Sequence, residues 1–193
     1  MLLAGLRIGR AVSPAQLRRQ QQHAFGSLSR VIFIANAESD VGARDGKVKS
    51  FGEHHGDLDL KLEKHPDQGG KGGGTNPEEL FACGYAVCFN GALRLVAVKN
   101  GIKIGHSRVK VSVSLCIEPE EVTAAIPFSI GLAAKVIAEI QGVYGPTAQK
   151  CADLAHEFCP FSRATGQHGR GGCWHCQVRG GLICQIERTE LLN

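Results

Sequence analysis

Two cysteines are the residues of this chain whose types and positions could carry chemistry. Cys88 lies within the almost wholly apolar run FACGYAVCFNGALRLVAV, and Cys159 lies directly before Pro160. A buried free cysteine usually packs as a small hydrophobic residue, whereas a cysteine thiolate is a nucleophile that oxidises reversibly to a sulfenic acid. The residues alone leave both interpretations of Cys88 open. A thiol at a helix end, such as Cys159, suits a mobile resolving partner.

The remaining cysteines are interpreted as packing residues or as members of a weak metal motif. Cys83, Cys116 and Cys151 fall in apolar or alternating segments. The motif CWHC, residues 173–176, offers zinc ligand types, but a single CxxC without a second pair at zinc spacing is weak. We therefore expect no metal and no cofactor.

A glycine-rich stretch, GGKGGGTNP, precedes the apolar run and could be taken for a phosphate-binding loop. It lacks the GK[ST] ending of that motif, and the acidic Glu78 and Glu79 that follow would repel a phosphate. We interpret it as a flexible loop.

The N-terminus differs in composition from the rest of the chain. Met1 to Ala37 contains no Asp or Glu but five arginines, so the net charge of +4 is concentrated there and does not indicate a nucleic-acid partner. Arginine-rich, acid-free leaders with interspersed leucines are typical of organellar transit peptides. We predict residues 1–30 as a mitochondrial transit peptide and residues 31–193 as one domain in the matrix. A disordered basic tail on a cytoplasmic protein is the alternative.

The elements that must position the cysteines follow from periodicity and breakers. Residues 31–37 and 58–65 are predicted strands, and Asp45-Gly46 favours a tight hairpin turn that would carry Arg44. Asn76 and Pro77 start a helix that runs to Asn100-Gly101, and its apolar composition predicts cover on several sides. No apolar run reaches the roughly 20 uninterrupted residues of a membrane helix, so no membrane insertion is expected.

The second half of the chain alternates strands and a helix. Residues 107–117 and 127–143 are predicted strands, and a second helix begins at Pro146 and stops at Pro160. GLICQIERTEL, residues 181–191, could add an edge strand. The pattern β-β-β-α-β-β-α predicts an α+β fold with antiparallel sheets and long helices packed on them.

Three motifs in this order and spacing give the chain a family resemblance. GARDG, GTNPEELFACGYAVCFNGAL and AHEFCPFSRAT closely resemble the organic hydroperoxide resistance (Ohr) branch of the OsmC/Ohr family, from about Ala35 to Thr165. The resemblance implies an intertwined homodimer, with sheets packed around two long helices and two active sites at the interface. It fails from about residue 166, which leaves the last strand in doubt.

The resemblance also implies roles for four residues. Cys88 takes the peroxidatic position and Cys159 the resolving one, while Arg44 and Glu78 bracket the reactive thiol. An arginine beside a thiol favours the thiolate, and a glutamate can hold the arginine by a bidentate pair. The implied activity is thiol peroxidase, with alcohol as product, an intrachain disulfide as intermediate and a dihydrolipoyl protein or other dithiol as reductant.

Alternatives of two kinds remain open at this point. A non-catalytic OsmC-like redox sensor or lipid-binding protein would share the fold, and so would an enzyme of the sister OsmC branch with a different oxidant preference. The presence of both cysteines favours the enzyme, and NPEEL and CPFSRAT favour the Ohr branch. Three aromatic neighbours, Phe81, Phe89 and Phe161, suit an alkyl or lipid hydroperoxide better than hydrogen peroxide.

Overall fold

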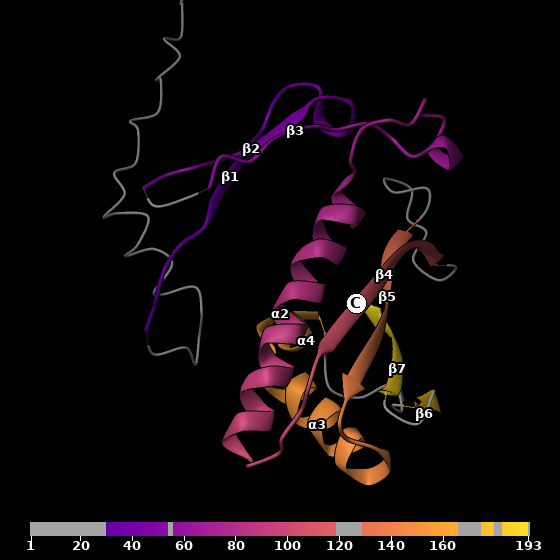
Figure 1. The fold of residues 1–193 in the computed structure, drawn as a ribbon. Coiled ribbons are helices and arrows are strands. Elements are labelled where there is room, and N and C mark those ends of the chain that lie inside the picture. Colours follow the sequence, from indigo (N-terminus) through magenta and orange to yellow (C-terminus); the bar gives the residue numbers. More distant parts are fainter. Residues whose placement is uncertain (1–29, 54–55, 119–128, 166–174, 180–182, 193) are drawn as a thin grey trace, which may run out of the picture.

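The computed structural model describes residues 30–53, 56–118, 129–165, 175–179 and 183–192, the last two segments by backbone only. They form two antiparallel sheets and two long helices, as the α+β prediction requires (Figure 1). The first sheet lies at the N-terminal end of helix α2, and the second sheet packs along that helix together with α3.

The first sheet has the order β1-β2-β3, with β1 at Asn36–Ser39, β2 at Lys47–Phe51 and β3 at Asp59–Lys61. The predicted turn between β1 and β2 is present and contains a short 3-10 helix, η1, at Ala43–Asp45. The predicted strand at 31–37 is wrong at its start. Asn36 pairs with Phe51, the last residue of β2, so residues before it have no partner strand, and Ile32 is 84% exposed.

Helix α2 spans Pro77–Lys99, as predicted. The Asn76 side chain accepts a hydrogen bond from the Glu79 backbone N–H at 2.8 Å, a cap that contributes about 1 kcal/mol to helix stability. At the other end the chain turns at Asn100 and Gly101, where the glycine has φ of 67° and the left-handed conformation favours that residue type. A second 3-10 helix, η2, at Pro66–Gln68 lies in the connection before α2.

The second sheet has the order β4-β5-β7-β6. The long hairpin of β4 at Ser107–Glu118 and β5 at Ser129–Gln141 confirms both predicted strands. The tail supplies β6 at His175–Arg179 and β7 at Ile183–Leu192. The expectation that the last segment would be an edge strand is wrong, because β6 pairs with its outer side and leaves β7 between β5 and β6.

Helix α3 at Gly145–Phe158 ends before Pro160, as predicted. A further helix that was not predicted, α4 at Pro160–Thr165, begins at this same proline. Proline is tolerated in the first turn of a helix, where its missing N–H is not needed. Cys159 therefore has an extended backbone conformation and lies between the two helices.

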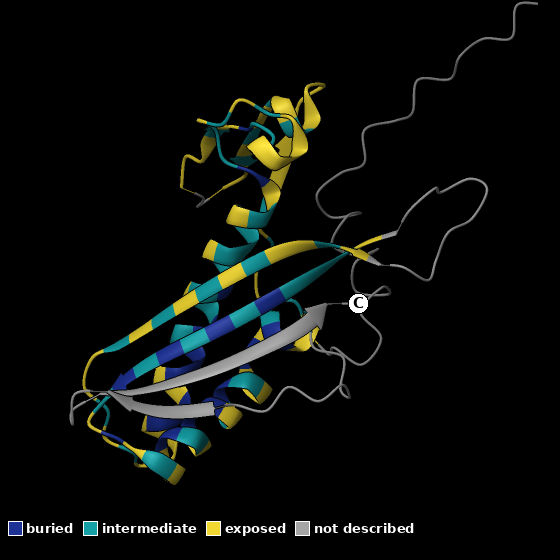
Figure 2. Ribbon diagram, turned by 90° about the vertical axis from the view of Figure 1, so that its right-hand side faces the viewer, coloured by how far each residue is buried: buried dark blue, intermediate teal, exposed yellow. Residues whose placement is uncertain are grey.

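The core lies between one side of α2, the second sheet and α3, with Tyr85, Phe89 and Leu93 wholly buried. Figure 2 shows buried residues alternating with intermediate ones along β5, and intermediate residues alternating with exposed ones along β4. The other side of α2 is open in the single chain: Val87 is 77% and Val98 75% exposed. The prediction that α2 is covered on several sides is therefore not met within one chain.

Helix α2 is also long and apolar enough, by length and composition alone, to cross a membrane. The sequence-based prediction considered only uninterrupted apolar runs. Averaged over the whole helix, the glycines and Asn90 lower the hydropathy too little to exclude a membrane span. The packing of Tyr85, Phe89 and Leu93 into the protein core is that of a core helix of a globular domain.

Candidate active site

The structure brings the two predicted thiols together. The Cys159 sulfur lies 3.4 Å from the Cys88 sulfur, and both cysteines are free. Cys88 projects half-buried from the middle of α2, and Cys159 is completely buried. The backbone of Cys159 is fixed on both sides: its N–H donates to the Ala155 carbonyl at 2.8 Å, and its carbonyl accepts from the Arg163 N–H at 3.0 Å.

The surroundings of Cys88 act on its protonation in opposite directions. Burial raises the pKa of the Cys88 thiol, a hydrogen bond from the Phe161 backbone N–H lowers it, and the neighbouring Cys159 raises it further, for a net rise. A thiol with a raised pKa is a poor nucleophile near neutral pH. The role of the Phe161 N–H was not predicted from the sequence, because Phe161 belongs to α4, a helix that was not predicted.

The predicted pair of Arg44 and Glu78 is also present, as a bidentate fork. Arg44 Nη2 donates to Glu78 Oε1 at 2.7 Å and Nη1 to Oε2 at 3.2 Å, while Nη1 also reaches Gln68 Oε1 at 3.4 Å. Burial raises the pKa of Glu78, but hydrogen bonds from Arg44 and the backbone, with the arginine charge, outweigh it and leave the pKa low. A partly exposed pair contributes only about 0.2–1 kcal/mol to stability, so its importance lies in where it holds the guanidinium.

The turn that carries Arg44 is built from small and acidic residues. Asp40 Oδ1 accepts hydrogen bonds from the N–H groups of Gly42 and Lys47, both at 3.0 Å. A side chain at Gly46 would place its Cβ 2.8 Å from the Gly42 Cα, so the two glycines permit the close approach of the backbone. The GARDG motif thus specifies the shape of this turn.

The two pairs lie apart within one chain. Glu78 is in the first turn of α2 and Cys88 lies ten residues later, about 15 Å along the helix axis. Figure 1 shows the first sheet at one end of α2 and α4 beside the middle of the helix, and Arg44 lies in η1 between strands β1 and β2 of that first sheet. The expectation that Arg44 bracket Cys88 is therefore not met within a single chain.

Aromatic side chains surround the approach to the thiols. Phe161 stacks on Tyr85 with ring centroids 5.9 Å apart, and Phe81 lies 5.7 Å from Phe161. Phe81 and Phe161 are half-buried, whereas Phe89 is completely buried in the core. Phe89 therefore belongs to the core, and that Phe81 and Phe161 neighbour a substrate stays a prediction.

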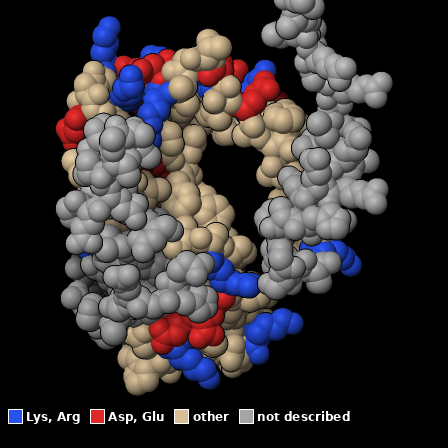
Figure 3. All heavy atoms as spheres, turned by 180° about the vertical axis from the view of Figure 1, so that it is seen from behind, with Lys and Arg blue, Asp and Glu red and all other residues tan. Residues whose placement is uncertain are grey.

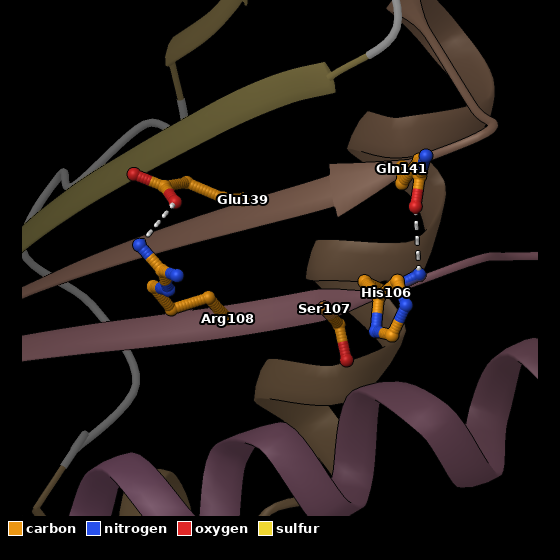
Figure 4. A pocket seen from close by; sticks show the side chains of 5 residues that line it. All are labelled: His106, Ser107, Arg108, Glu139 and Gln141. Atoms are coloured by element: carbon orange, nitrogen blue, oxygen red, sulfur yellow. Dashed lines mark hydrogen bonds and ion pairs between the residues drawn. The ribbon is translucent and has the colours of Figure 1, made fainter.

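A pocket at the edge of the second sheet contains no cysteine. Figure 4 shows its lining residues, which are His106, Ser107, Arg108, Glu139 and Gln141. Glu139 accepts from Lys110 at 2.8 Å, and Gln141 Oε1 accepts from the His106 N–H at 3.2 Å. The pocket contains no thiol, and its Ser107 hydroxyl is already engaged, donating to Asn90 Oδ1 at 2.7 Å, so the cysteine pair is the better candidate for the active site.

Two predicted features fall outside the described residues. These are the leader, residues 1–29, and the first half of the CWHC motif, residues 173–174. The second half of the motif, His175 and Cys176, is described by backbone only. Within the described part of the chain no three His, Cys, Asp or Glu residues could hold a metal ion. The absence of metal at CWHC stays a prediction.

Fold and site together define a class: an α+β protein in which a core helix and the end of a second helix hold two cysteines in contact. The model of the OsmC-like protein family matches residues 70–169, which include α2, β4, β5, α3 and both thiols. The chain belongs to the OsmC family, in its organic hydroperoxide resistance branch.

Relatives and solved structures support this assignment. An organic hydroperoxide resistance protein of Xanthomonas axonopodis pv. citri is 36% identical over 143 residues, covering 73% of this chain and 92% of the relative. The solved structure of an organic hydroperoxide resistance protein from Legionella pneumophila is similar at TM-score 0.61 and 34% identity, with 70% and 90% of the two chains covered. OhrB of Bacillus subtilis is similar at TM-score 0.56 and 34% identity, with 72% and 94% covered.

Proposed function

We propose that this protein is a cysteine-based peroxidase that reduces organic hydroperoxides to alcohols, with Cys88 as nucleophile and Cys159 as resolving thiol. The 3.4 Å contact of the two sulfurs, one half-buried and one buried, carries the proposal. A relative named for organic hydroperoxide resistance supports the choice of substrate. The half-buried Phe81 and Phe161 add an apolar approach to the thiols.

The reaction balances with two thiols and one hydroperoxide. The Cys88 thiolate attacks one peroxide oxygen, the O–O bond breaks, and the leaving alkoxide takes a proton to give the alcohol. Cys88 becomes a sulfenic acid. The Cys159 sulfur then attacks the sulfenic sulfur, water leaves, and a disulfide forms. An external dithiol reduces the disulfide by exchange and is itself oxidised to a disulfide. A dihydrolipoyl group is the reductant that the family resemblance implies.

A homodimer would complete this site. The open side of α2 carries the exposed residues Cys83, Val87, Gly91 and Val98 at helical spacing, with Arg94 as a charged residue among them. If a second copy packed its own α2 antiparallel on this side, with the two-fold axis near Cys83, Glu78 would lie opposite the partner's Cys88. The guanidinium held by Glu78 would then reach the thiol of the other chain.

The first sheet also favours an intertwined arrangement. It stands apart from the second sheet, and of its strand residues none is buried, although Leu62 just beyond β3 is. Figure 3 shows charged side chains gathered over the first sheet and at the opposite end of the face in view, with uncharged side chains between them. A second copy could cover that uncharged band and the open side of α2 together.

In this dimer Arg44 would have two roles. Its charge would favour the Cys88 thiolate of the partner chain against the burial that raises the thiol pKa. Its planar fork could also donate hydrogen bonds to the peroxide oxygen that gains charge as the O–O bond breaks.

A coupled peroxidase assay tests the activity. Purified protein is expected to consume cumene hydroperoxide faster than hydrogen peroxide when dihydrolipoamide is the electron donor, and more slowly with thioredoxin. Equal rates with the two oxidants would contradict the organic substrate. A protein that is oxidised once but turns over with neither donor would instead support the redox-sensor alternative.

We also propose that residues 1–30 direct the protein to mitochondria, where dihydrolipoyl proteins would be available. The five arginines and the absence of acidic residues support this. A fluorescent protein fused to Met1–Asn36 is expected to accumulate in mitochondria, and the same fusion with the five arginines changed to glutamine should not. Diffuse cytosolic fluorescence of the unchanged fusion would contradict the proposal.

A further inference from the structure

A second contact joins the same two segments as the thiol pair. The Tyr85 hydroxyl lies 2.9 Å from the Ser162 hydroxyl, and either group could donate the hydrogen bond. Tyr85 precedes Cys88 by three residues on α2, and Ser162 follows Cys159 by three residues on α4. Positions three apart on a helix are neighbours, so this bond runs beside the sulfur contact, one turn away.

Both hydroxyls are removed from solvent, which makes their pairing consequential. Tyr85 is 0% and Ser162 1% exposed. Buried polar groups lose free energy when left without a hydrogen-bond partner, so a buried pair of this kind disfavours separation of the elements that carry it. Separation of α4 from α2 would expose or orphan the Ser162 hydroxyl.

The aromatic packing links this bond to the thiols. Phe161, between Cys159 and Ser162, stacks on the Tyr85 ring at an interplanar angle of 26°. Its ring also lies close over Gly84, where an added Cβ would be 3.1 Å from a ring atom. The Phe161 backbone N–H is the group that hydrogen-bonds Cys88. Tyr85 therefore contacts both Phe161 and Ser162, the second and third residues after Cys159.

We propose that Tyr85 and Ser162 are positioning residues that act as a latch, holding Cys159 against Cys88 for the step in which the disulfide closes. The inference rests on the proposed peroxidase function and deepens it. To form a disulfide the sulfurs must approach from contact to about 2.05 Å, while Phe161 and Ser162 stay in place. With the latch intact, rotation of the Cys159 side chain suffices. Without it, α4 can separate from α2, and the Cys88 sulfenic acid reacts more slowly with the Cys159 thiol.

The latch predicts a selective kinetic effect. In Tyr85→Phe and in Ser162→Ala, sulfenic acid formation with one equivalent of cumene hydroperoxide should change by less than about twofold, because Cys88 itself is intact. Closure to the Cys88–Cys159 disulfide should slow by about tenfold, since a misplacement of reacting groups by about 1 Å can slow a reaction by up to about a hundredfold. Trapping of the sulfenic acid with dimedone and mass spectrometry of the quenched peptides measure both steps.

The controls separate a latch from general destabilisation. The double variant Tyr85→Phe/Ser162→Ala should close no more slowly than either single variant, because both changes remove the same bond. Tyr144→Phe, at the partly exposed tyrosine before α3, should behave as the wild type. Circular dichroism identifies any variant that fails to fold, and the remaining variants then decide the question.

A second readout needs no hydroperoxide. Limiting diamide oxidises a thiol pair directly, with the electrons passing to the diazene, so formation of the Cys88–Cys159 peptide pair reports closure even if the peroxidase function is wrong. Closure at the wild-type rate in the folded Tyr85→Phe and Ser162→Ala variants would overturn the latch. Equal slowing in Tyr144→Phe would overturn it too. A wild-type protein that closes with diamide but reduces no hydroperoxide would contradict only the proposed function.

Discussion

Replacing Cys88 by serine is expected to abolish hydroperoxide reduction, including the first turnover, because the hydroxyl cannot take the place of a thiolate nucleophile. Replacing Cys159 by serine should leave the first step intact. One equivalent of cumene hydroperoxide would be consumed, and a sulfenic acid would remain on Cys88. Under excess peroxide this acid should proceed to sulfinic and sulfonic acid, since the internal thiol that traps it is gone.

Stopped-flow measurement of hydroperoxide consumption and mass spectrometry of the Cys88 peptide distinguish these outcomes. Cys116→Ser is a matched control, because Cys116 lies on β4 and is not part of the thiol contact. It should retain wild-type turnover. A Cys88→Ser protein that still consumes one equivalent, or a Cys159→Ser protein that turns over many times, would reverse or remove the roles assigned to the two thiols.

The second large effect is expected at Arg44. In the proposed dimer Arg44→Ala should return the Cys88 pKa to the raised value that burial and Cys159 give it, so the alkylation rate of Cys88 at pH 6 should fall by about tenfold for each unit of pKa. The pH–rate profile should shift to higher pH, because the thiolate is the reactive form. Arg44→Lys should retain part of the effect, as it keeps the charge but loses the fork. Arg108→Ala, at an arginine whose side chain is 73% exposed, is the matched control.

Mixed dimers decide whether the arginine acts on its own chain or on the partner. Neither Arg44→Ala nor Cys88→Ser chains should be active alone. If Arg44 serves the partner's Cys88, a heterodimer of the two variants has one complete site, and an equal mixture should recover about a quarter of the wild-type activity. If the arginine serves its own chain, the mixture should stay inactive. The 15 Å separation along α2 predicts recovery.

Most of the fold could be predicted because its signals are local. The cap at Asn76 and Pro77 and the stop at Gly101 bounded α2, and strict alternation identified β4. Strand order is not a local property, which is why β7 was expected at an edge and lies between β5 and β6. Helix α4 was missed because Pro160 ends one helix and begins another within two residues.

The residues of the candidate site could be predicted from the sequence, but not all of their spatial relations. Cys88, Cys159, Arg44 and Glu78 could be named from motifs, and the contacts within each pair follow the expectation. The distance between the pairs could not be foreseen, because the motifs do not state which chain supplies each residue. The Tyr85–Ser162 bond was also out of reach, since nothing in either segment marks a partner 77 residues away.

The most direct measurement of the central claim is the identity of the disulfide that forms under mild oxidation. Wild-type protein treated with one equivalent of cumene hydroperoxide, alkylated and digested without reduction, is expected to yield a Cys88–Cys159 peptide pair as its main disulfide. The pair should vanish in Cys88→Ser and in Cys159→Ser. A dominant disulfide through Cys83 or Cys173, with Cys88 still alkylated as a free thiol, would contradict the account and leave Cys88 as a packing residue.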